Sequence, residues 1–122
     1  MRSLLIVSAV LLAAAPAFAA DDIMASTYGN TVIGKSGMGE VHTHYKADHT
    51  VTADATSPMG SMTLTGTWKI DDKGQLCRDY SNAPPMMPNP ICIPWTAHKV
   101  GDTWKVTRDG RTSDLSLVAG IK

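Results

Sequence analysis

The chain has 122 residues and carries 11 basic and 11 acidic side chains, so its formal net charge is 0 with histidine neutral. This balance, without a basic patch or an acidic block, argues against nucleic acid as a partner and against a solvating tail. The length fits one small domain, which buries a modest share of its surface and benefits from a covalent link.

Residues 1–20 have the layout of a secretory signal peptide. Arg2 precedes an apolar run, and Pro16 leads to a site of small residues at positions 17–19. The uninterrupted apolar run is shorter than the ~20 residues of a membrane-spanning helix. We therefore expect a single domain over residues 21–122, without a transmembrane segment after cleavage, in a periplasmic or secreted location.

Short segments with alternating side chains dominate the rest of the chain, and this period of two is typical of strands with one buried face. Three glycines in residues 34–39 predict a flexible connection between the first two strands. In the second strand, Val41, Thr43 and Tyr45 are expected to face inward. The predicted strands span residues 27–33, 40–46, 50–55, 62–70, 75–80, 91–95, 103–108 and 112–118.

The clearest strand covers residues 62–70, where Met62, Leu64 and Trp68 share one face that we expect to be buried. Residues 71–74, with the sequence DDKG, then reverse the chain, and Gly74 suits a positive φ. The last hairpin places Trp104 inward. No segment after residue 20 offers ten residues with apolar positions at helical spacing.

Two cysteines flank a proline-rich segment that cannot be an interior strand. Cys77 and Cys92 are separated by 15 positions, and an oxidising compartment favours a disulfide between them. Closing a loop of this length stabilises a fold by about 3 kcal/mol through chain entropy. A pair of metal thiolates and two free thiols are the alternatives. The sequence thus predicts an all-β fold, a small antiparallel barrel of about eight strands with one disulfide, with a β-sandwich as the alternative.

Several short motifs occur in a familiar order: Gly29-Asn30-Thr31, Gly66-Thr67-Trp68, Leu76-Cys77 and finally Cys92. This order resembles families of short exported bacterial proteins of unknown function with a lipocalin-like β-barrel. The resemblance implies a fold and a compartment, and no particular reaction. The PPMMPNP segment departs from the family pattern, so the resemblance does not imply a shared ligand.

Two histidines on one predicted strand are the clearest candidates for a metal site. His42 and His44 project from the outer face of one strand, about 6 to 7 Å apart along it. Imidazoles in this arrangement can share a metal ion, and His49 could approach them across the following turn. The alternative is a pair of solvated surface residues.

The methionines suggest a related interpretation, because thioethers suit Cu(I). Met59, Met86 and Met87 lie in predicted loops, where they could bind copper or form a flexible apolar contact surface. We therefore expect no cofactor, with copper as the one possible exception.

Catalytic motifs are absent: the sequence has neither a G-x-S-x-G elbow nor H-E-x-x-H. We predict no catalytic residues and a non-enzymatic binding module of the cell envelope. Its partner would be a small apolar ligand in the barrel mouth or an envelope protein, bound through Met86, Met87 and a partly exposed Trp95. The alternatives are a periplasmic copper-binding protein that uses His and Met side chains, and an inhibitor of an exported hydrolase.

Overall fold

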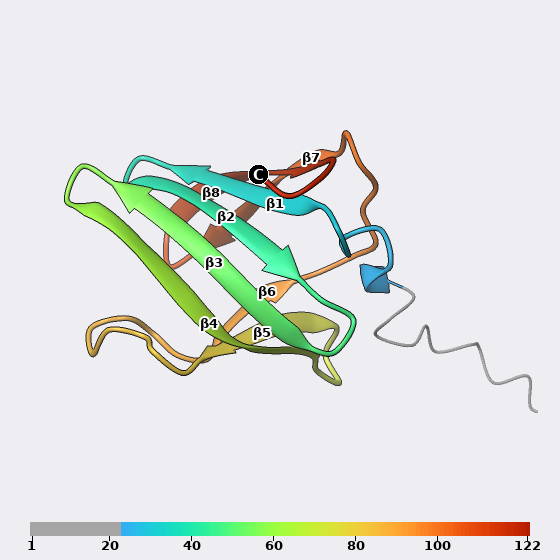
Figure 1. The fold of residues 1–122 in the computed structure, drawn as a ribbon, viewed down its shortest axis with the longest axis horizontal. Coiled ribbons are helices and arrows are strands. Elements are labelled where there is room, and N and C mark those ends of the chain that lie inside the picture. The colour runs from blue at the N-terminus through green and yellow to red at the C-terminus, as the bar shows by residue number, and fades with distance from the viewer. Residues whose placement is uncertain (1–22) are drawn as a thin grey trace, which may run out of the picture.

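The computed structural model describes residues 23–122, which form eight antiparallel strands (Figure 1). The predicted signal peptide, residues 1–20, lies outside the described residues. The strands are β1 Thr31–Ser36, β2 Gly39–Tyr45, β3 Thr50–Ser57, β4 Gly60–Ile70, β5 Gln75–Tyr80, β6 Ile91–Pro94, β7 Thr103–Arg108 and β8 Arg111–Val118.

All eight strands belong to one sheet with the order β6-β5-β4-β3-β2-β1-β8-β7. Strands β1 to β6 follow one another as a meander, and β8 returns to pair with β1. The sheet curls so that its two edges, β6 and β7, approach each other without pairing along their length (Figure 1). The fold is therefore a nearly closed barrel rather than the alternative β-sandwich.

The predicted boundaries are correct for β5 and β7 and wrong for β1. Residues 27–30 form turns, and β1 runs from Thr31 to Ser36 through Gly34. The glycine-rich segment was expected to be a flexible connection, but the reversal itself takes only Gly37 and Met38. Glycine weakens a strand without forbidding it, and here both neighbouring strands pair with Gly34.

The barrel interior is filled by side chains. Alternation places the predicted inward residues Thr43, Tyr45, Leu64 and Trp68 in the core, as expected for a barrel whose inner rows face one another. From outside the sheet, Met24 of the N-terminal turns joins the same core. The other core residues include Val32, Val51, Ala53, Leu76, Tyr80, Ile91, Ile93, Trp95, Leu115 and Leu117.

The strand connections alternate between two ends of the barrel (Figure 1). One end, here called the loop end, carries the connections 37–38, 58–59, 81–90 and 109–110. The opposite end, here called the closed end, carries the connections 46–49, 71–74 and 95–102 together with residues 23–30. Met62 was expected in the core, but it lies near the loop end and is 41% exposed.

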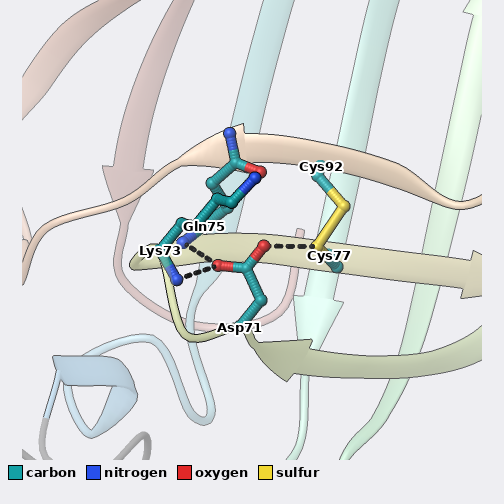
Figure 2. The surroundings of a disulfide bond; sticks show 5 residues. All are labelled: Asp71, Lys73, Gln75, Cys77 and Cys92. Atoms are coloured by element: carbon teal, nitrogen blue, oxygen red, sulfur yellow. Dashed lines mark hydrogen bonds between the residues drawn. A yellow bond between two sulfur atoms is a disulfide. The ribbon is translucent and has the colours of Figure 1, made fainter.

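The predicted disulfide is present. Cys77 and Cys92 stand directly opposite each other in β5 and β6 and are bonded, so the metal-thiolate and free-thiol alternatives are wrong. Figure 2 shows Asp71 beside this bond, with one carboxylate oxygen 3.8 Å from the Cys77 Sγ. Its other oxygen accepts from the N–H groups of Lys73 at 2.9 Å and Gln75 at 2.8 Å. Asp71 therefore shapes the β4–β5 turn.

Within residues 23–122, the structure contains no helix of the length and apolarity needed to cross a bilayer.

Candidate functional site

A cleft of about 590 Å³ lies at the seam of the barrel, between β6 and β7. It forms because β6 has only four residues and ends at Pro94, which lacks the N–H that a continuing strand would donate. The unpaired side of β7 then faces the chain that follows β6. The cleft is lined by Lys73, Gly74, Gln75, Pro94, Trp95, Thr96, His98, Trp104, Lys105, Val106 and Thr107.

Three aromatic rings form one wall of the seam cleft. The rings of Trp95 and Trp104 meet edge to face, with centroids 5.6 Å apart. His98 stacks on Trp104 at 3.6 Å and presents an edge to Trp95 at 5.0 Å. Edge-to-face and stacked contacts of this kind favour a fixed arrangement of the rings, so this wall of the cleft is preorganised.

Two hydrogen-bond donors in this wall lack acceptors. The indole Nε1 atoms of Trp95 and Trp104 are both buried without a hydrogen-bond partner in the described part of the chain. Leaving a buried donor unsatisfied costs about 1–3 kcal/mol, and such groups are rare in native proteins. By contrast, the third indole, that of Trp68, donates to the main-chain oxygen of Lys46 at 2.8 Å. Both tryptophans line the cleft, so its aromatic wall contains two buried donors without acceptors in the described part of the chain.

Two lysines lie exposed at the rim of the cleft, and none of the described residues that line it is acidic. Lys105 is paired with Asp114 at 2.6 Å, which leaves Lys73 as the rim cation without a carboxylate among the cleft residues. Burial lowers the pKa of His98, against the opposing effect of Asp102 at 3.7 Å. Since a lowered pKa favours the neutral imidazole near pH 7, the aromatic wall carries no charge there.

Trp95 was expected to be partly exposed, and this expectation is wrong: only 6% of its surface is exposed. The alternation of β6 continues past Pro94, because Ile91, Ile93 and Trp95 are all buried while Pro94 is exposed. Trp95 therefore faces the core at the closed end. Met86 is 95% exposed on the β5–β6 loop, whereas Met87 is half-buried against the core. The three predicted partner-binding residues therefore do not form one surface.

The two sequence-predicted histidines converge on a single atom. His42 Nδ1 and His44 Nε2 each lie 3.2 Å from the main-chain oxygen of Lys122. This oxygen is positioned by the start of β1, because Thr31 Oγ1 accepts from the N–H of Lys122 at 3.0 Å and donates to the Gly120 oxygen at 2.8 Å. The C-terminal segment therefore lies along the outer face of β2.

A carboxylate completes this group: Glu40 lies 3.2 Å from His42 Nε2. The hydrogen bond from His42 lowers the pKa of Glu40, helped by Lys35 at 3.4 Å. His49 does not join the group as expected. It stacks on Trp68 with centroids 4.1 Å apart.

Met86 and Met87 lie in the loop after β5, and in the sheet β3 and β4 separate β5 from the strand β2 of the two histidines. Met59 lies in the connection between β3 and β4. A copper role for the histidines and methionines stays a prediction.

One inward-facing cation was not predicted from the sequence. Arg78 is half-buried on the inward row of β5 between Leu76 and Tyr80, and it hydrogen-bonds the side chains of Tyr45 and Tyr80. Its Nε atom is buried without a partner in the described residues. Burial raises the pKa of Tyr45 to about 12, although Arg78 opposes the shift. The alternation in residues 76–80 would have been enough to place Arg78 inside.

Compared with known proteins, the chain matches no family model, no curated protein and no solved structure.

Proposed function

We propose that this protein is a non-enzymatic binding module that holds a small, largely apolar molecule in the seam cleft. The observation that carries the proposal is that the two tryptophans lining the cleft, Trp95 and Trp104, have buried indole N–H groups without acceptors. A ligand oxygen that reached these groups would satisfy donors that are otherwise costly to bury. The disulfide supports an exported, oxidising location for the module.

The seam is favoured over the barrel interior because the interior is packed with core side chains. A volume of about 590 Å³ is within the range of small-molecule sites, which are mostly apolar with a few polar groups. The aromatic wall suits a flat or aliphatic body, and Lys73 at the rim favours a negative charge, whereas Lys105 is already paired with Asp114. The ligand class is therefore a small apolar carboxylate.

The test uses the three indole N–H signals in a ¹H–¹⁵N spectrum, with 2-naphthoate as the probe. We expect 2-naphthoate to shift the signals of Trp95 and Trp104 and to leave that of Trp68, which is already bonded to Lys46. A Trp104→Phe variant keeps an aromatic ring and removes one donor. It should bind 2-naphthoate about tenfold more weakly, which corresponds to roughly 1.4 kcal/mol for one hydrogen bond to a charged acceptor.

The control ligand is naphthalene, which has the same rings and no acceptor. Its affinity should be nearly equal for the native protein and the Trp104→Phe variant. The proposal is wrong if 2-naphthoate leaves the signals of Trp95 and Trp104 unchanged, or if it shifts only that of Trp68.

A further inference from the structure

The face formed by His42 and His44 carries a second, independent site. Its starting observation is that two ring nitrogens and one main-chain oxygen meet at a point, with both N···O distances equal to 3.2 Å. The three atoms come from β2 and from the segment after β8, nearly 80 positions away in the sequence. The hydrogen bonds of Thr31 and Asn30 hold that segment in place.

Glu40 determines which nitrogen of His42 is available. A neutral imidazole has one N–H and one lone pair, and the carboxylate 3.2 Å from Nε2 favours the proton on that nitrogen. The lone pair of Nδ1 then points at the Lys122 oxygen, which is also an acceptor. Two acceptors facing each other repel unless a proton or a metal ion lies between them.

His44 does not have this conflict. Its Nδ1 lies 3.5 Å from the hydroxyl of Thr52, and its Nε2 faces the same Lys122 oxygen. The ring can either donate to the oxygen or turn a lone pair toward a shared ion. Thr52 can donate its hydroxyl hydrogen to Nδ1, which would leave Nε2 to carry the proton in the metal-free state.

The distance from each ring nitrogen to the Lys122 oxygen fits a transition-metal ion. Bonds of about 2.0 Å in a tetrahedral site separate neighbouring ligand atoms by roughly 3.3 Å, close to the 3.2 Å of both N···O pairs. A carboxylate on the far nitrogen of a ligating histidine is the usual outer partner of such sites, since it fixes the tautomer and raises the basicity of the ring. Glu40 occupies this position on His42.

We propose that His42 Nδ1, His44 Nε2 and the main-chain oxygen of Lys122 bind a divalent transition-metal ion, with Glu40 orienting His42. Imidazole nitrogen selects Zn²⁺ and Cu²⁺ over the hard cations Mg²⁺ and Ca²⁺, which prefer oxygen ligands. The half-buried rings leave the remaining coordination positions open to water. This site is separate from the seam cleft and does not depend on the function proposed for it.

The test is a Zn²⁺ titration of the full protein, observed through the histidine ring signals. Zn²⁺ should shift the signals of His42 and His44 and leave those of His49 and His98, which stack on tryptophans. Mg²⁺ at the same concentration should shift none of the four. This measurement on the native protein does not depend on any variant folding.

Three variants locate the ligands. A His42→Gln, His44→Gln double variant should lose Zn²⁺ affinity by at least a hundredfold, and removal of residues 121–122 should weaken it about tenfold. Glu40→Gln should weaken it about tenfold while both histidines keep their Zn²⁺ response, as expected of a positioning residue. His49→Asn is the matched control, because Asn tolerates the positive φ of that position, and it should leave the affinity unchanged.

The proposal is overturned if Zn²⁺ shifts neither His42 nor His44, or if the double variant binds Zn²⁺ as well as the native protein. It is also overturned if Mg²⁺ gives the same shifts as Zn²⁺, since a nonspecific charge effect would then explain the response. Circular dichroism of each variant identifies any that fail to fold. If a variant does not fold, the Zn²⁺ titration of the native protein alone tests the proposal.

Discussion

At the scale of single residues, the barrel depends on a glycine that allows two strands to approach closely. Gly66 faces inward on β4 opposite Tyr80, and a Cβ added there would lie 1.9 Å from the main-chain oxygen of Asp79. Because backbone atoms cannot move aside cheaply, Gly66→Ala should lower the free energy of unfolding by about 3 kcal/mol. Urea unfolding measures this loss.

Gly34→Ala is the matched control, since nothing lies within 4 Å of the corresponding Cβ and the φ of Gly34 is not positive. It should change stability by no more than about 1 kcal/mol, in the stabilising direction if at all. Equal losses for the two variants would show that β4 and β5 do not depend on close contact at Gly66.

Side-chain alternation predicted the direction of most single residues, and its failures have physical reasons. It placed Tyr45 and Trp68 inward correctly, because both lie within regular strands. Trp95 was expected to be partly exposed because it follows the strand-breaking Pro94, yet it continues the buried row of Ile91 and Ile93. Met62 is on the inner row but lies near the loop end, so facing inward did not bury it. The meeting of His42 with Lys122 depends on tertiary structure that local periodicity cannot encode.

At the scale of elements, the disulfide controls the seam through β6. This short edge strand pairs along its length only with β5, to which Cys92 ties it. Replacing Cys77 and Cys92 with alanine should lower the free energy of unfolding by about 3 kcal/mol. It should also speed amide hydrogen exchange in β6 and shift the indole N–H signal of Trp95. Amides of β3 should still exchange much more slowly than those of β6. Unchanged exchange in β6 would contradict this role.

The connection of residues 95–102 should make the seam sensitive to acid. Burial lowers the pKa of His98 below its ordinary value of 6.5, so the unfolded chain takes up a proton more readily than the folded one. The resulting contribution to stability is present above about pH 6.5 and is lost as the pH falls through the lowered pKa. Urea unfolding from pH 7 to pH 5 measures this loss.

A His98→Phe variant keeps the stacked ring on Trp104 and removes the titrating group. The native protein should lose stability relative to this variant as the pH falls, and its affinity for 2-naphthoate should change in the same interval as the seam loosens. Parallel curves for the two proteins would show that His98 does not link acid to the seam.

At the scale of the whole molecule, the sequence predicted the fold class, the disulfide and most of the strands, because these depend on local alternation, turns and one covalent link. It did not predict the seam cleft. That cleft results from where β6 stops relative to β7, and the gap appears only when the sheet curls and its ends meet. The candidate binding site is therefore a property of barrel closure and not of any one segment.

Alkaline pH should unfold the whole barrel through its core. Burial raises the pKa of Tyr45 to about 12 from its ordinary 10.0, and burial also raises that of Tyr80. A raised pKa contributes stability that is present below pH 10 and is lost as the pH rises through the folded value. Two pH units for Tyr45 alone correspond to about 3 kcal/mol, a large share of the stability of a small domain.

Tyrosine ionisation, followed by absorbance near 295 nm, should therefore coincide with loss of the circular dichroism signal between pH 10 and 12. Tyr45→Phe is the informative variant. It should be less stable at pH 7, because Arg78 loses a buried hydrogen-bond partner, and it should lose less further stability above pH 10. If Tyr45 instead ionises near pH 10 while the barrel stays folded, its ring is not held in a packed interior. The interior would then have room for a ligand, and the small-ligand site would have to be sought there rather than at the seam.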